Sequence, residues 1–202
     1  MAIVSFHYSH DPVLPPLTIF DIETTGLDPL RGHRIIEIAG VRMENGKVLD
    51  EHFVTLVNPE REIPWDAQQV NKITDKEVQS APTIDLVLPQ FLEFAKGSML
   101  MAHNAQFDYG FLEAEKQYCW GFVELPECLC TMLLSRSLYP SDFRHSLDVL
   151  IKRFNLEMPV ERHRALADVL LTAQALQKMI EAGSISSFEE LKKRAGVKVG
   201  VK

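Results

Sequence analysis

Apolar residues along the first part of the chain follow the pattern of a sheet. Residues 17–23, 34–43 and 48–57 are apolar-rich runs of strand length, which predicts three strands. The second and third runs are joined by Glu44-Asn45-Gly46-Lys47, and Asn-Gly between two such runs is a strong hairpin signal. We therefore expect an antiparallel meander at the start of the domain.

From residue 83 onward the apolar spacing changes to that of helices. A short apolar strand is expected at residues 98–102, and Asn104 stands where it can cap the helix that follows. Strand–helix units that complete an antiparallel meander are typical of an α/β domain. Helices are expected over residues 83–95, from Asn104 to about Lys116, over 146–154 and over 164–182.

Prolines and charge suggest where the domain begins and ends. Three prolines among residues 12–16 separate an N-terminal arm, residues 1–16, from the first strand. Gly183 follows the last long helical pattern and is expected to stop it. We therefore expect a domain over residues 17–183 and a basic C-terminal tail over 184–202, with one short amphipathic piece, SFEELKKR, at 187–194.

Two acids in the first strand need an explanation. Strand alternation puts Asp21 and Glu23 on the same face as Leu17 and Ile19, although the run is apolar on both faces, as in a covered central strand. An unpaired ionised carboxylate in such a place costs several kcal/mol. We therefore expect a positive charge to meet these two side chains; an arginine or a helix N-terminus would serve as well as a metal ion.

Three later residues are candidates to join them. Asp108 lies four residues into the helix after Asn104. His163 and Asp168 would point about 140° apart on one ideal helix, so we expect His163 on the loop and Asp168 in the first turns of the helix. Four carboxylates at one place repel one another unless divalent cations lie between them, and oxygen ligands suit Mg²⁺ or Mn²⁺.

Composition and charge restrict the protein class. The chain has 202 residues, 46% of them hydrophobic and 24% charged, without an apolar run of membrane-spanning length, which predicts one globular domain in the cytoplasm. Its three cysteines are expected to be free thiols. The formal charge of −7 argues against nucleic acid, but two divalent ions in the acidic site would offset about four of these charges.

Three motifs in order carry a family resemblance. FDIETTG at residues 20–26, HNAQFD at 103–108 and HRALAD at 163–168 resemble the motifs of the DEDDh 3′–5′ exonucleases, the DnaQ-like family related to the proofreading ε subunit of bacterial DNA polymerase III. Each motif alone is weak, whereas the three together are specific. The resemblance covers residues 17–182 and implies a ribonuclease-H-like α/β fold, a five-stranded mixed sheet flanked by helices.

The resemblance also implies roles for single residues. Two Mg²⁺ or Mn²⁺ ions would be held by the four acids: Asp21 bridging both, Glu23 and Asp168 completing the nucleophile-side site, and Asp108 supporting the other. His163 would deprotonate the attacking water. The residues expected to contact the terminal nucleotide are Thr24, Thr25, Gly26, Leu27, Phe107 and Asn104.

Two positions depart from the usual family pattern. Asn71-Lys72 stands where many relatives have His-Gly, and Cys130-Thr131 stands where many have Asp-Thr. The first departure concerns the contact with the terminal nucleotide, and therefore substrate preference rather than chemistry.

The sequence therefore predicts a metal-dependent 3′–5′ exonuclease of the proofreading or repair type. It would release nucleoside 5′-monophosphates from single-stranded or frayed 3′ ends of DNA, with a DNA polymerase as a candidate partner and no membrane. An RNA-trimming exonuclease of the ribonuclease T or oligoribonuclease kind is the alternative, because the same site can cleave either sugar. A non-catalytic binding module is disfavoured because all five chemical positions are filled.

Overall fold

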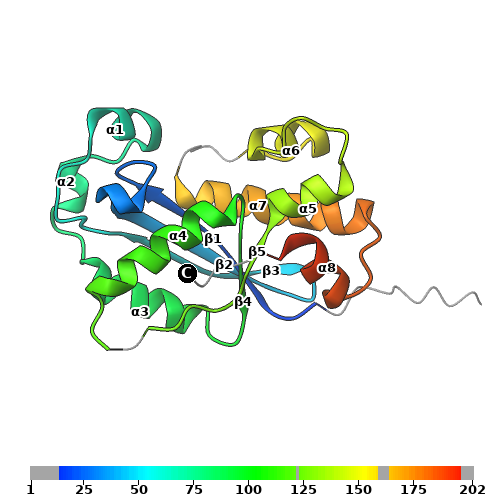
Figure 1. The fold of residues 1–202 in the computed structure, drawn as a ribbon, viewed down its shortest axis with the longest axis horizontal. Coiled ribbons are helices and arrows are strands. Elements are labelled where there is room, and N and C mark those ends of the chain that lie inside the picture. Colours follow the sequence, from blue (N-terminus) through cyan, green and yellow to red (C-terminus); the bar gives the residue numbers. More distant parts are fainter. Residues whose placement is uncertain (1–13, 122, 159–163, 197–202) are drawn as a thin grey trace, which may run out of the picture.

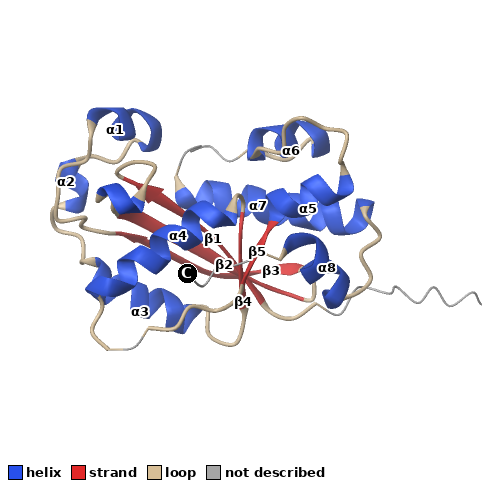
Figure 2. Ribbon diagram, in the orientation of Figure 1, coloured by secondary structure: helices blue, strands red, loops and turns tan. Residues whose placement is uncertain are grey.

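A computed structural model of the protein describes residues 14–121, 123–158 and 164–196. One mixed sheet runs through the middle of this part of the chain (Figures 1 and 2). Its strand order is β3-β2-β1-β4-β5; β1 pairs antiparallel with β2 and parallel with β4. The strands are β1 Leu17–Thr24, β2 Ile35–Glu44, β3 Lys47–Leu56, β4 Met99–Ala102 and β5 Cys128–Cys130. The expected five-stranded ribonuclease-H-like sheet is confirmed.

The hairpin between β2 and β3 forms where the Asn-Gly pair predicts it. Glu44 pairs with Lys47 across the turn. Asn45 and Gly46 both have positive φ, 48° and 76°, as the tight turn that matches strand twist requires. The expected antiparallel meander is therefore confirmed.

Helices cover both faces of the sheet (Figure 1). The helices α3 and α4 pack on the face that carries Phe20 and Ile22, while α5 to α8 pack on the face that carries Leu17 and Ile19. The alternation expected along β1 is thus correct, and β1 is covered on both sides. The helices are α1 Trp65–Asn71, α2 Asp75–Val78, α3 Ile84–Phe94, α4 Ala105–Glu115, α5 Thr131–Leu138, α6 Leu147–Phe154, α7 Ala165–Ala182 and α8 Phe188–Ala195.

Two short 3₁₀ turns, η1 Pro29–Arg31 and η2 Lys116–Tyr118, complete the elements. Cys128 and Cys130 are buried free thiols in β5, and Cys119 is a half-buried one. None of the helices in the described ranges is long and apolar enough to cross a bilayer.

The C-terminal helix α8 belongs to the same core as α7. Leu191 and Ala195 are fully buried, and Gly196 forms a bridge with Leu129 of β5. At the other end of the described chain, Leu14 is also part of this core. We therefore propose that the compact domain extends from about Leu14 to Gly196, beyond the expected limits of 17 and 183.

Candidate active site

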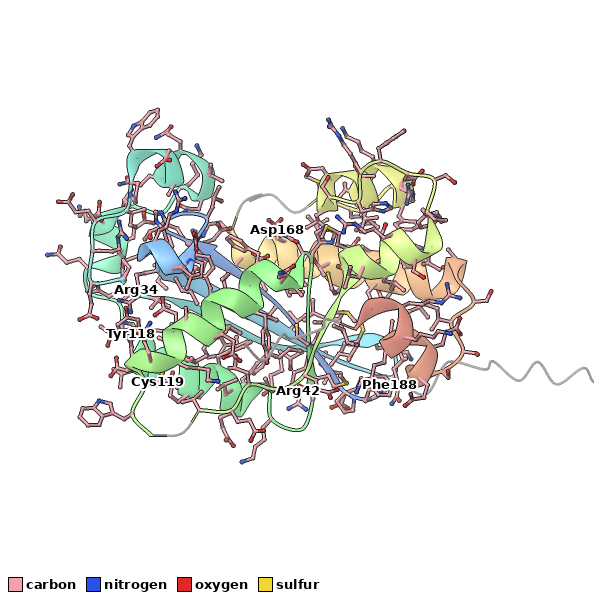
Figure 3. The ribbon with its side chains drawn as sticks, viewed as in Figure 1. Arg34, Arg42, Tyr118, Cys119, Asp168 and Phe188 are labelled. Atoms are coloured by element: carbon pink, nitrogen blue, oxygen red, sulfur yellow. The ribbon has the colours of Figure 1, made fainter. Side chains whose placement is uncertain are left out.

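Three acidic side chains converge at the end of β1. Asp21, Glu23 and Asp168 each offer a carboxylate oxygen, and these oxygens lie within 4.8 Å of one another. Asp168 comes from the first turn of α7 (Figure 3), as expected, and α7 packs across β1. All three side chains are half-buried, so the cluster is accessible to an ion and to a substrate.

Asp108 approaches the same strand from the opposite face. It lies in the first turn of α4, is 2% exposed, and its carboxylate accepts a hydrogen bond from the backbone amide of Ile22. Burial raises the pKa of Asp108 to about 7 despite this hydrogen bond. Asp108 is not within the tight group of three. The residue that it contacts, Ile22, stands between Asp21 and Glu23 in the sequence of β1.

The donor set fits a hard divalent cation. The clustered atoms are carboxylate oxygens, which suit Mg²⁺ or Mn²⁺ better than softer metals. Burial of Asp108 disfavours its ionised form, and a nearby cation would reverse that preference. The residues present therefore fit the ions that the sequence predicts.

A buried ion pair fixes the start of α7. Glu37 of β2 is 1% exposed, and its carboxylate accepts from Arg164 Nε at 3.1 Å, from Arg164 Nη2 at 2.5 Å and from the backbone amide of Ala165 at 2.9 Å. It thus caps the N-terminus of α7, one turn before Asp168. Because Glu37 lies directly opposite Glu23 in the sheet, the Arg164 guanidinium also offsets repulsion between these two carboxylates.

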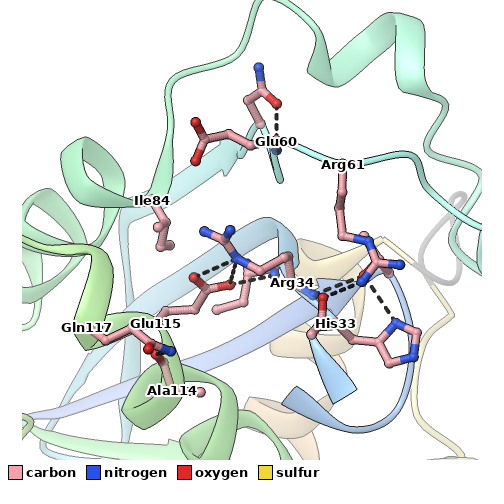
Figure 4. A network of polar contacts seen from close by, with 12 residues as sticks. His33, Arg34, Glu60, Arg61, Ile84, Ala114, Glu115 and Gln117 are labelled. Carbon is pink, nitrogen blue, oxygen red and sulfur yellow. Dashed lines mark hydrogen bonds and ion pairs between the residues drawn. The ribbon is translucent and has the colours of Figure 1, made fainter. Parts of the chain in front are cut away.

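A second buried ion pair fixes the far end of α4 (Figure 4). Glu115, 2% exposed, accepts from Arg34 Nε at 3.0 Å and from the backbone amide of Ile35 at 3.0 Å. The Arg34 guanidinium also stacks on the Tyr118 ring, 3.9 Å from its centroid. β2 is therefore tied to both helices that carry site acids. Sequence reasoning did not assign roles to Glu37 or Glu115; a charged residue inside the apolar run RIIEIAGV was the available signal.

The turn after β1 is held by its own threonines. Thr24 donates its hydroxyl to the carbonyl of Gly26 at 2.6 Å. The Thr25 hydroxyl accepts from the Arg34 amide at 2.9 Å and lies 3.3 Å from His33 Nδ1. Both threonines are buried, whereas Leu27 is 84% exposed. Thr25, Gly26 and Leu27 line one cavity of about 450 Å³, so this turn has space beside it, as a nucleotide contact requires.

Asn71-Lys72, which stands where many relatives have His-Gly, has a structural consequence. Asn71 is buried; its side-chain Nδ2 donates to the Thr24 carbonyl at 3.3 Å, and its side-chain Oδ1 accepts from the Ile73 backbone amide at 2.9 Å. Lys72 ends α1 in the left-handed region, with φ 60°. Glycine adopts that conformation without strain, so Lys72 carries a backbone cost that glycine would avoid.

Two expected nucleotide contacts lie at the start of α4. Asn104 occupies the N-cap position but has φ 62° and makes no side-chain capping hydrogen bond, so the expectation that its side chain caps the helix is wrong. Its side chain is exposed. Phe107 is half-buried and packs on Phe111, with ring centroids 5.0 Å apart. His163, the expected base, lies outside the described residues.

Comparisons with known proteins agree on one family. The exonuclease family model RNase_T matches residues 18–176. DNA polymerase III subunit epsilon of Rickettsia typhi is 37% identical over 180 residues, covering 87% of this chain and 78% of the relative. An epsilon-like protein of Rhodobacter capsulatus is 43% identical over 166 residues, covering 81% of this chain and 23% of the relative.

Solved structures show the same likeness. Exonuclease X in complex with 5′ overhanging duplex DNA is 31% identical, with a TM-score of 0.71, over 88% of this chain and 98% of that one. The nuclease domain of 3′hExo, a DEDDh family member bound to rAMP, has a TM-score of 0.78 at 20% identity, over 94% of this chain and 100% of that one. At 20% identity, the likeness to 3′hExo shows the fold alone.

Proposed function

Because this chain belongs to the exonuclease family and is a DnaQ-like 3′–5′ exonuclease of the DEDDh type, we propose that it hydrolyses the terminal phosphodiester at 3′ ends of DNA with the aid of two divalent cations. The observation that carries this proposal is the convergence of the Asp21, Glu23 and Asp168 oxygens within 4.8 Å. Water would attack the terminal phosphorus and the 3′ oxygen of the preceding nucleotide would leave, which releases a nucleoside 5′-monophosphate.

The four acids would share the two ions, Mg²⁺ or Mn²⁺. Asp21, Glu23 and Asp168 supply the clustered oxygens, and Asp108 supplies a buried carboxylate at the Ile22 amide. When bound, such a pair of ions activates a water molecule and stabilises the charge on the leaving oxygen. Asp21 would serve both ions, so its loss would be the most damaging replacement of an acid.

His163 is the proposed general base. It directly precedes Arg164, which the buried Glu37 carboxylate holds in place. This anchor fixes the chain one residue away from the base and one turn before Asp168. Removal of a positioned base commonly costs about 10²–10⁴-fold in rate, and we expect His163→Ala to fall in that range while DNA still binds.

DNA is the proposed substrate because the relatives with 36–43% identity are DNA polymerase III epsilon subunits or epsilon-like proteins and exonuclease X was solved with DNA. The same relatives suggest a DNA polymerase as partner and a cytoplasmic location. RNA is the second candidate: neighbours solved with rAMP or a histone mRNA stem-loop share the fold at 18–20% identity.

The test is digestion of end-labelled single-stranded DNA, RNA and duplex DNA with Mg²⁺, with Mn²⁺ or with excess chelator. Products resolved by length should be mononucleotides released from free 3′ hydroxyl ends of DNA, and circular single strands should resist. RNA cleaved faster than DNA would overturn the substrate choice. Full activity in chelator would overturn the metal requirement.

A pair of variants separates the site from the rest of the surface. Asp21→Ala should abolish turnover, whereas Glu93→Ala, which removes an exposed acid on α3, should leave it unchanged. Near-normal turnover of Asp21→Ala with Mg²⁺ would show that the acids are assigned to the wrong site.

A further inference from the structure

The loop between α5 and α6, residues 139–146, presents an aromatic side chain directly to solvent. Phe143 is 103% exposed, and its neighbour Arg144 is also exposed. Arg144 has neither a hydrogen bond nor an ion pair with any residue in the described part of the chain. A phenyl ring in water gains nothing for folding, because its apolar area stays hydrated.

The loop is nevertheless firmly held. His145 is buried; its Nδ1 lies 2.8 Å from the Ser135 hydroxyl and its Nε2 lies 3.1 Å from the Asp142 carbonyl. Arg153 pairs with the Asp142 carboxylate and stacks on the Tyr139 ring, 3.9 Å from its centroid. Phe143 is thus presented by a pre-organised loop, so little conformational entropy remains to be lost when a partner covers it.

A groove lies between the start of α4 and α5, the helix that leads into this loop. Its volume is about 390 Å³, and it runs between Asn104 and Gln106 on one side and Met132, Leu133 and Arg136 of α5 on the other. In the common view of Figures 1 and 3, Asp168 lies between α1 on one side and the α5–α6 pair on the other. The groove therefore joins the helix that carries Asp108 to α5, whose lining residue Arg136 lies three residues before the α5–α6 loop begins.

Arg136 links the groove to the loop. It is exposed on α5, one turn after Met132, and close enough to His145 to act on it. Burial and, secondarily, the charge of Arg136 lower the pKa of His145. His145 is therefore neutral near pH 7, and the positive charge of this surface comes from its arginines and lysine.

The region formed by α5, the α5–α6 loop and α6 has a charge opposite to that of the whole protein. The chain as a whole has a formal charge of −7, whereas residues 131–156 contain four basic and two acidic side chains. One of the two acids, Asp142, is paired with Arg153. An arginine beside an exposed aromatic ring is the combination that binds a phosphate and stacks on a base of a single strand.

We propose that Phe143 and Arg144 form a binding surface for the single-stranded nucleic acid upstream of the scissile end. A base of the strand stacks on the Phe143 ring, Arg144 contacts an adjacent phosphate, and the intervening nucleotides follow the groove past Arg136. This inference rests on the proposed function and deepens it: it names unpaired single strand as the substrate form that the surface favours.

The first experiment compares Phe143→Ala with wild type on single-stranded DNA of about 20 nucleotides, longer than typical sites of 4–16, and on a dinucleotide too short to reach the loop. Loss of one stacked base should raise KM for the long strand by roughly 5- to 100-fold, with turnover at saturation and dinucleotide cleavage within two-fold. Phe143→Tyr should restore the KM.

Trp120→Ala is the matched control. Trp120 is 93% exposed, but it follows Cys119, which lies far from Asp168 in Figure 3. Removing this exposed aromatic should leave KM for the long strand unchanged. An equal KM in Phe143→Ala and wild type would overturn the proposal and assign the surface to a protein partner instead.

Binding measured in chelator keeps this test separate from the chemistry. A 2-aminopurine base placed at successive positions from the 3′ end should be quenched at one upstream position in wild type and not in Phe143→Ala. Arg144→Gln should lower the salt slope of affinity by about 0.7. Absence of any hydrolysis by wild type would overturn the proposed function, whereas absence of the quenched position would overturn the stacking surface alone.

Discussion

Asp108 gives the metal-free protein a measurable dependence on pH. Its pKa rises from the ordinary 3.8 to about 7, with burial as the largest cause. The folded state therefore keeps the proton that the unfolded chain loses. By linkage, the stability from this group is complete below about pH 4 and is lost as the pH rises through 7.

The perturbation is Asp108→Asn, which removes the titration and keeps the shape of the side chain. The difference of about 3 pH units between the two pKa values, at about 1.4 kcal/mol each, corresponds to an upper limit of about 4 kcal/mol. About 2 of these 3 pH units lie above pH 5, so relative to wild type the variant should gain up to about 3 kcal/mol of unfolding free energy between pH 5 and pH 8. The exonuclease activity should be lost.

The assay is urea denaturation in excess chelator at several pH values. Carboxylates remote from Asp108 titrate equally in both proteins, so the difference between wild type and variant reports on Asp108 and the groups beside it. Mg²⁺ should stabilise wild type at pH 8, since ligands that bind only the folded state raise its stability, and should stabilise the variant less. A difference in unfolding free energy that stays constant from pH 5 to pH 8 would refute the reasoning.

Further predictions concern the supporting structure, and each is measured by chemical or thermal denaturation. Glu37→Ala should lower the free energy of unfolding by about 3 kcal/mol, because it breaks a buried ion pair; an unchanged value would show that the pair is not formed. Lys72→Gly should raise it by about 1 kcal/mol, and a loss of stability would contradict the left-handed helix end. Leu191→Ala should lower it by about 2–5 kcal/mol, and truncation after Gly183 by at least as much; an unchanged melting temperature would mean that α8 does not pack on the domain.

Periodicity was enough to predict the parts of the fold with a strong local signal. The Asn45-Gly46 hairpin, the alternation along β1 and the long helix α7 all appear within one or two residues of their expected limits. The three-residue strand β5, in contrast, is too short to show a period. Its pairing with β4 depends on contacts distant in sequence, which no local pattern contains.

For the site, too, the sequence predicted what its motifs carry and missed contacts between distant residues. Motif order was sufficient to predict that Asp21, Glu23 and Asp168 would meet. The two buried ion pairs could not be predicted, because Glu37 joins Arg164 across 127 positions of the chain and Glu115 joins Arg34 across 81. The cap expected of Asn104 failed because its backbone is left-handed, which residue type alone does not reveal.

The two ion pairs explain how acids on separate elements stay in register. Each buried glutamate accepts from an arginine Nε and from one backbone amide, and both pairs involve β2: Glu37 binds the first amide of α7, and Glu115 of α4 binds the first amide of β2. β2 also pairs with the whole of β1, the strand that carries Asp21 and Glu23. A shift of either helix along the sheet would separate a buried charge from its partner, which costs several kcal/mol. The positions of Asp108 and Asp168 relative to β1 are therefore fixed by contacts outside the acidic cluster, before any cation is bound.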